Sequence, residues 1–134
     1  MKGAVWTNLW RVLAVLAIVL IWAGSLWPAD SLRDLDLPYF NDKVAHFSGY
    51  FVVAVLLKLG WRRAPLWLLW LVATVSGGLA ELAQALLTTT RAMEWLDFVA
   101  NGCGALVGLL LTAGLYRVFE LMTGRATTHS VPES

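Results

Sequence analysis

The sequence predicts an all-α membrane protein, an antiparallel bundle of four transmembrane helices. The chain has 134 residues, of which 59% are hydrophobic, and its mean hydropathy is +0.68. Only 14% of the residues are charged, whereas an average soluble domain has about 25%. Four apolar stretches can each cross a bilayer, and four crossings of about 20 residues use most of the chain. We therefore expect one domain over residues 1–123, followed by a disordered cytoplasmic tail over residues 124–134, which are mostly small and polar.

The first apolar stretch runs roughly from Leu9 to Trp27 and ends at Pro28, which does not fit into a helix interior. Lys2 and Arg11 before an apolar run would also suit a signal peptide. We favour an uncleaved membrane anchor, because the apolar run is longer than the core of a typical signal peptide.

Three further spans follow, over about Val44–Gly60, Leu66–Leu87 and Trp95–Leu121. The connection over residues 28–41 is too polar to cross a membrane and is interrupted by Pro38. We expect this connection to lie on the outer surface.

The distribution of basic residues predicts the orientation, because Lys and Arg in short loops favour the cytoplasmic side. With four alternating spans, seven basic residues fall on one side of the membrane: Lys2, Arg11, Lys58, Arg62, Arg63, Arg117 and Arg125. Arg33, Lys43 and Arg91 fall on the other side. Both chain termini are therefore predicted to be cytoplasmic.

Charge and cysteine content exclude two classes of function. A net charge of +1 with scattered basic residues provides no surface for nucleic acid. The single cysteine, Cys103, excludes an internal disulfide and a cysteine-based structural zinc site.

Polar residues recur at helical spacing in the outer half of the second predicted span. Asp42, His46 and Tyr50 stand at positions i, i+4 and i+8, so they form one stripe along that helix, and Lys43 stands beside them. We expect the stripe to face protein rather than lipid. A charge within a membrane span is costly, so its first interpretation is functional.

The third and fourth spans carry matching polar groups at the same level. Glu81 and Gln84 lie one turn apart near the outer end of the third span, and Asp97 and Asn101 lie one turn apart at the start of the fourth. Arg91 stands in the connection above them. Three helices are therefore predicted to present polar faces to a common hollow that opens to the outside.

Glycines accompany these polar groups. Gly77 and Gly78 precede Glu81, and Gly104 with Gly108 forms a small-xxx-small pattern after Asn101. Such residues let helix backbones approach closely. The same pattern also serves self-association, so it leaves the oligomeric state open.

In chain order these motifs resemble those of the VanZ-like family of small bacterial membrane proteins. The resemblance extends over about residues 9–119 and rests on these segments: Ser25-Leu26-Trp27-Pro28, Asp42-Lys43-Val44-Ala45-His46, Tyr50, Glu81-Leu82-Ala83-Gln84, Arg91, Trp95-Leu96-Asp97, Asn101 and Gly104. The ordered combination of DKxxH, ExxQ, R and DxxxN is much more specific than any single motif. The resemblance implies a bacterial cytoplasmic membrane protein linked to the cell envelope, because the family takes its name from a teicoplanin-resistance accessory protein. It implies a fold and a set of motifs, but no reaction.

Our leading functional hypothesis is an outward-facing pocket for an anionic lipid or a lipid-linked envelope component. Lys43, Arg91 and protonated His46 would meet a phosphate group. The sequence leaves open whether the pocket also modifies its ligand, with His46 as acid or base beside a carboxylate. The catalytic candidates are His46, Glu81 and Asp97, and the ligand-binding candidates are Asp42, Lys43, Tyr50, Gln84, Arg91 and Asn101.

Three alternatives stay open. The polar groups can act purely as interhelical contacts in a noncatalytic scaffold or partner-binding protein. One imidazole and three carboxylates, from His46, Asp42, Glu81 and Asp97, would suit a divalent metal. We nevertheless assign no metal ligand and name no cofactor, because nearby cationic side chains oppose a metal ion. A proton or solute pathway is a third alternative, although four helices are few for a transporter.

Overall fold

A computed structural model of the chain describes residues 2–27, 42–87 and 94–124. These ranges hold four helices: α1 (Lys2–Leu26), α3 (Asp42–Gly60), α4 (Leu66–Leu87) and α5 (Trp95–Met122). The expectations for the connection over residues 28–41, for Arg91 and for the tail from residue 125 onward lie outside the described residues.

The four predicted spans are confirmed, and α4 has the predicted bounds. The largest difference is at α1, which begins at Lys2 rather than Leu9. Apolar composition marks only the part of the helix that suits the membrane interior. The helix itself also includes the residues that precede Leu9, because backbone hydrogen bonding does not end where the apolar stretch begins.

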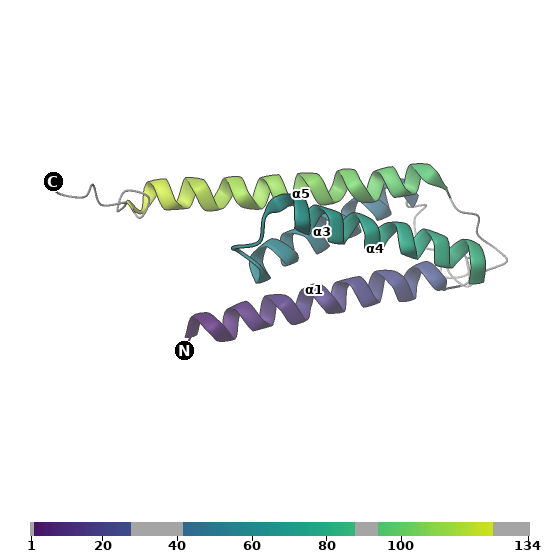
Figure 1. Cartoon of the computed structure of the whole chain (residues 1–134), viewed down its shortest axis with the longest axis horizontal. Coiled ribbons are helices and arrows are strands. Elements are labelled where there is room, and N and C mark those ends of the chain that lie inside the picture. Colours follow the sequence, from purple (N-terminus) through teal and green to yellow (C-terminus); the bar gives the residue numbers. More distant parts are fainter. Residues whose placement is uncertain (1, 28–41, 88–93, 125–134) are drawn as a thin grey trace, which may run out of the picture.

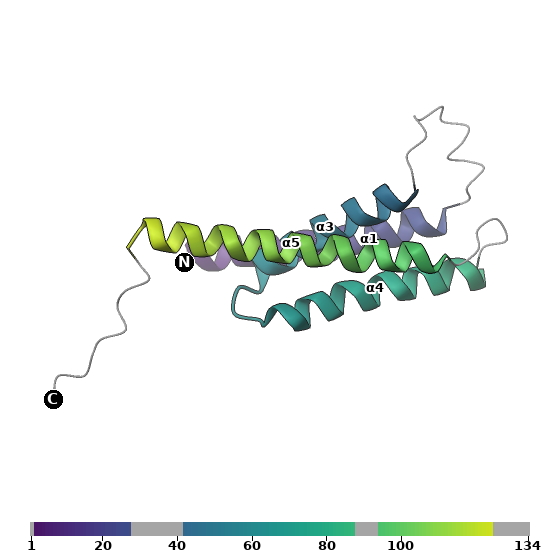
Figure 2. The ribbon, with the colours of Figure 1, turned by 90° about the horizontal axis from the view of Figure 1, so that it is seen from above.

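Neighbouring helices in the chain run in opposite directions, so α1 starts and α5 ends at the same end of the bundle (Figure 1). We call the other end, where α1 and α4 end and α3 and α5 begin, the polar end. The long helices α1 and α5 lie on opposite sides of α3 and α4 and do not contact each other within the described ranges, whereas α3 packs against all three other helices. Figure 2 shows the same antiparallel bundle from above.

The outer surface of the bundle is apolar and its interior is small. The core consists mainly of Tyr50, Val53 and Ala54 of α3, packed with Ala105 and Leu109 of α5. Large apolar side chains are exposed along all four helices. All four helices are long and apolar enough to cross a membrane. This distribution indicates an all-α, multi-pass membrane protein in which lipid contacts the apolar exterior.

Glycines bring α5 against the backbone of α3. A Cβ atom added at Gly104 would overlap the carbonyl oxygen of Phe47, and one added at Gly108 would lie 2.6 Å from the carbonyl oxygen of Phe51. The predicted packing face of Gly104 and Gly108 is therefore confirmed. On α4, a Cβ at Gly77 would lie 2.7 Å from Nδ2 of Asn101. Glycine at position 77 thus makes room for the Asn101 side chain between α4 and α5.

Basic side chains close the end of the bundle opposite the polar end. The buried Lys58 donates hydrogen bonds from Nζ to the carbonyl oxygens of Arg62 (2.8 Å) and Ala64 (3.3 Å). Arg11 of α1 donates from Nε to the carbonyl oxygen of Gly60 at 3.0 Å, and its guanidinium lies 5.3 Å from the ring centroid of Trp61. Backbone carbonyls at the end of α3 thus satisfy both cations.

We predict that Gly104→Ala destabilises the bundle by about 1–3 kcal/mol, because the new methyl group forces α3 and α5 apart. Gly114→Ala on the same helix is the matched control, since nothing lies within 4 Å of a Cβ at that position. Unfolding in mixed micelles titrated with denaturing detergent measures both variants. Equal stability of the two variants would contradict close packing of α5 on α3.

Candidate functional site

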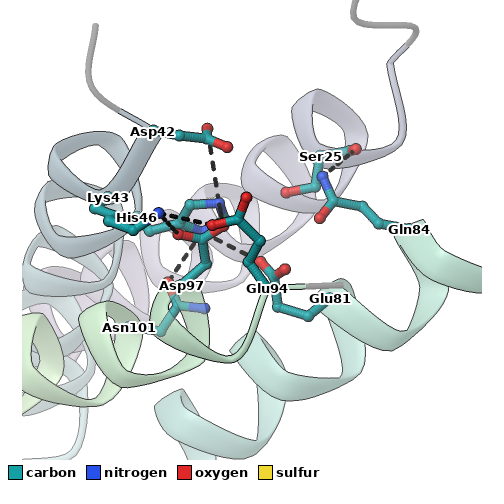
Figure 3. A network of polar contacts seen from close by, with 9 residues as sticks. All are labelled: Ser25, Asp42, Lys43, His46, Glu81, Gln84, Glu94, Asp97 and Asn101. Atoms are coloured by element: carbon teal, nitrogen blue, oxygen red, sulfur yellow. Dashed lines mark hydrogen bonds and ion pairs between the residues drawn. The ribbon is translucent and has the colours of Figure 1, made fainter. Parts of the chain in front are cut away.

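The polar end gathers ionisable side chains from three helices (Figure 3). Asp42 lies in the first turn of α3 and Asp97 in the first turn of α5. Carboxylates are favourable at these positions, because the backbone N–H groups at a helix start carry partial positive charge. The helix starts therefore help to hold the two acids at one level.

His46 is the centre of the site, and its Nδ1 atom contacts two other helices. This nitrogen lies 3.1 Å from Oδ1 of Asn101 on α5 and 3.4 Å from Oε1 of Glu81 on α4. The Asn101 oxygen is a hydrogen-bond acceptor, so the tautomer with the proton on Nδ1 donates to it, while the Glu81 carboxylate lies beside the same nitrogen as an ion-pair partner. The imidazole ring is thereby held in one orientation by α4 and α5.

The other ring nitrogen of His46 faces two carboxylates. Nε2 lies 3.9 Å from Oδ1 of Asp42 and 4.0 Å from Oδ2 of Asp97. The side chains of His46 and Asp97 are only 9% and 5% exposed, whereas that of Asp42 is 59% exposed. Asp42 is therefore at the mouth of the site. We expected the whole stripe of Asp42, His46 and Tyr50 to face protein, and this expectation is wrong at Asp42, because α3 begins there.

Lys43 connects α3 to the start of α5. Its Nζ atom lies 2.7 Å from Oε2 of Glu94 and 3.4 Å from Oδ1 of Asp97. The Lys43 ammonium, through its hydrogen bond and its charge, lowers the pKa of the Glu94 carboxyl below its ordinary range. Glu94 keeps its negative charge to lower pH than an isolated glutamate does.

Glu94 is the site residue that the sequence analysis missed. It immediately precedes α5, outside every motif and every predicted span. The one available signal was its spacing, because Glu94 stands three residues before Asp97 and so on the same side of the helix start.

Gln84 and Tyr50 lie at the border of the site. Gln84 donates a hydrogen bond from Nε2 to the carbonyl oxygen of Ser25 at 2.8 Å, which ties α4 to the end of α1. Tyr50 is buried, and Ser76 and Glu81 are its polar neighbours. Trp22 of α1 donates to the same Ser76 hydroxyl at 3.2 Å. These contacts connect α1, α3 and α4 around the polar end.

A cavity of about 260 Å³ opens beside His46, between α1 and α3. Its lining consists of Ile21, Gly24 and Ser25 of α1 and Asp42, Ala45, His46, Gly49 and Tyr50 of α3. The small residues Gly24, Ala45 and Gly49 leave this space, while His46 and Asp42 provide its polar edge.

The predicted convergence of polar groups is confirmed for Asp42, Lys43, His46, Glu81, Asp97 and Asn101. Gln84 is close by, but its amide is directed at α1, and Arg91 lies outside the described residues. Comparison of the chain with family models, curated proteins and solved structures finds no match. The chemistry of the site is therefore inferred from its own residues.

We predict that Lys43→Gln returns the pKa of Glu94 toward the ordinary range of an exposed glutamate, because the hydrogen bond and the positive charge beside it are both removed. Carbon-13 NMR of glutamate carboxyl groups in micelles, titrated from neutral to acidic pH, measures this value. Arg63→Gln, an exposed cation at the opposite end, is the control and should leave Glu94 unchanged. An unaltered Glu94 titration in Lys43→Gln would show that Lys43 does not hold this carboxylate.

Proposed function

We propose that the polar end binds a phosphate-bearing lipid or a lipid-linked component of the bacterial cell envelope, and that His46 performs acid–base chemistry on it. The observation that carries the proposal is the cavity between α1 and α3. It combines a wall of apolar and small residues, such as Ile21 and Ala45, with the polar side chains of His46 and Asp42. A lipid likewise places a polar headgroup directly beside apolar chains.

The size and position of the cavity favour a headgroup over a whole lipid. Its volume of about 260 Å³ is just below the range of about 300–1,000 Å³ that is typical of small-molecule sites. Both helices that form it are apolar enough to cross the membrane. The headgroup would occupy the cavity with its phosphate at the rim beside Asp42, toward Lys43, which lies just outside the cavity lining. The acyl chains would lie along the apolar outer surface of α1.

Lys43 and Arg91 are the proposed phosphate ligands, since Lys offers a compact positive charge and Arg a planar pair of donors. Glu94, the closest partner of Lys43, has a side chain that is 57% exposed. It can therefore turn into solvent when a phosphate oxygen takes its place on Nζ.

His46 is the proposed acid–base residue. With Nδ1–H held by Asn101 and Glu81, the Nε2 atom is directed toward the mouth. In the proposed reaction Nε2 accepts a proton from an attacking hydroxyl group, whose oxygen bonds to phosphorus. The bond from phosphorus to the leaving alcohol breaks, and Nε2 returns the proton to the alcohol oxygen.

We further propose that the chain is a VanZ-like protein of the bacterial cytoplasmic membrane. Its motif residues Asp42, His46, Glu81, Asp97 and Asn101 support this proposal, because the contacts described above make them one site. The proposed orientation places both termini in the cytoplasm and the polar end on the outer side of the membrane. The excess of basic residues at the opposite end favours this orientation.

A noncatalytic scaffold is the second candidate function, and the connectivity of the site favours it. Lys43 joins α3 to α5, His46 joins α3 to both α4 and α5, and Gln84 joins α4 to α1. Polar contacts of this kind hold helices together in lipid without any ligand.

Ligand retention tests the binding part of the proposal. Native mass spectrometry of protein purified without delipidation should show a retained phosphorus-containing lipid in the wild type. Lys43→Ala and Arg91→Ala should release it, because each removes a positive charge from the headgroup. Arg63→Ala is the control at the opposite end. No retained lipid in the wild type, or equal release by Arg63→Ala, would contradict the proposal.

Comparative lipidomics tests the chemical part. A bacterial host that produces the wild-type protein should accumulate or lose a phosphate-bearing envelope lipid, and His46→Gln should reduce that change by about 100-fold or more. Ser48→Ala, an exposed substitution on the same helix, should behave as the wild type. The catalytic assignment is wrong if His46→Gln, at equal membrane abundance, still produces the wild-type change. Under the scaffold function, any loss follows the amount of folded protein instead.

A further inference from the structure

We infer that the polar end holds a divalent metal ion, bound by Nε2 of His46 and by one carboxylate oxygen each from Asp42 and Asp97. The ligand atoms of these three residues all lie within 4.8 Å of one another. Figure 3 shows Asp42 and Asp97 beside the His46 ring. Two reasons stood against assigning a metal ligand from the sequence: nearby cationic side chains oppose a metal ion, and spacing along the chain does not show which side chains converge.

The distances between the proposed ligand atoms fit a metal ion once the three side chains move slightly closer together. Bonds of about 2.0–2.2 Å to a metal place neighbouring ligand atoms roughly 3–3.5 Å apart. Nε2 of His46 lies 3.9 Å from Oδ1 of Asp42 and 4.0 Å from Oδ2 of Asp97. The exposed Asp42 side chain is free to change rotamer and so to shorten its distance to Nε2. The distance from Nε2 to the buried Asp97 would shorten through a small rotation of the His46 ring or of the Asp97 carboxylate.

The remaining polar atoms of the two buried ligands already have partners of the kind that orient metal ligands. Nδ1 of His46 is held by Asn101 and Glu81, which leaves the lone pair of Nε2 for an ion. Oδ1 of Asp97 forms an ion pair with the Lys43 ammonium at 3.4 Å, and Oδ2 faces His46. Hydrogen bonds to the far side of a ligating histidine or carboxylate are a regular feature of metal sites.

The charge of the site also favours a cation. Among the described residues, four carboxyl groups contact either His46 or Lys43, namely those of Asp42, Glu81, Glu94 and Asp97, and Lys43 supplies the one ammonium group beside them. Both Glu81 and Asp97 are buried. Lys43 does not block the ion, because it contacts Oδ1 of Asp97 whereas the proposed ligand is Oδ2.

The ligand set favours a first-row transition ion over Mg²⁺ or Ca²⁺. One imidazole and two carboxylates suit Mn²⁺ or Zn²⁺, whereas Mg²⁺ and Ca²⁺ prefer oxygen ligands alone. Three protein ligands leave coordination positions open at the exposed mouth. This inference rests on the proposed function only for the role of the ion, which would attract a phosphate oxygen into an acidic site. With Nε2 bound to the ion, His46 would act as a ligand, and the ion would take over from it the activation of the attacking hydroxyl group.

Mn²⁺ binding to the full chain tests the inference without any lipid ligand. The protein is purified in uncharged detergent, stripped with EDTA and titrated with MnCl₂, and electron paramagnetic resonance follows the signal of unbound Mn²⁺. Pulsed measurements on the bound ion should show coupling to one imidazole nitrogen. Asp42→Asn should weaken Mn²⁺ binding by about tenfold or more. Because the Asp42 side chain is 59% exposed, we expect this variant to keep the fold.

Glu94→Gln is the matched control, because it removes one negative charge from the same site without removing a proposed ligand. Its Mn²⁺ affinity should stay close to that of the wild type. Absence of nitrogen coupling, no binding tighter than a Kd of about 1 mM, or equal weakening by Asp42→Asn and Glu94→Gln would each overturn the inference. Lipid retention without Mn²⁺ binding would reject the metal site alone, whereas Mn²⁺ binding without lipid retention would support the metal site and reject the proposed function.

Discussion

A polar side chain inside a lipid-embedded bundle has no water for its hydrogen bonds, so it must find partners on neighbouring helices. His46 meets this requirement through Asn101 on α5 and Glu81 on α4, at 3.1 and 3.4 Å. These contacts fix how far α3 is inserted between the other two helices and how it is rotated about its axis. A different rotation of α3 would turn the imidazole toward lipid and remove its contacts with Asn101 and with the buried Glu81 carboxylate.

The glycines make these short contacts possible. Asn101 occupies space that a side chain at position 77 would fill, and Gly104, three residues further along α5, lies against the backbone of α3 next to His46. The polar site therefore depends on the close packing of the helix backbones. Larger residues would separate α3 from α4 and α5 by more than the length of a hydrogen bond, and the polar groups would then lose their partners.

The two ends of the bundle satisfy their charges in different ways. At one end Lys58 and Arg11 donate to backbone carbonyl oxygens, which closes the helix termini and leaves no acid beside them among the described side chains. At the polar end the charges are held by other side chains, and His46 and Asp42 line a cavity. Only this second arrangement presents reactive groups to a ligand, which is why both proposals concern the polar end.

The sequence by itself determined the number of helices, their approximate bounds and the level at which the polar residues lie, because apolar length and helical spacing are local properties. It identified Asp42, Lys43, His46, Glu81, Asp97 and Asn101 as members of one site, since antiparallel spans bring equal depths together. It did not determine which atoms meet, because that depends on the rotation of each helix about its axis. Only the tertiary structure showed that Asn101 and Glu81 share Nδ1 of His46, that Glu94 pairs with Lys43, and that Gln84 turns to α1. Side-chain packing between helices sets those rotations, and no spacing along a single helix records them.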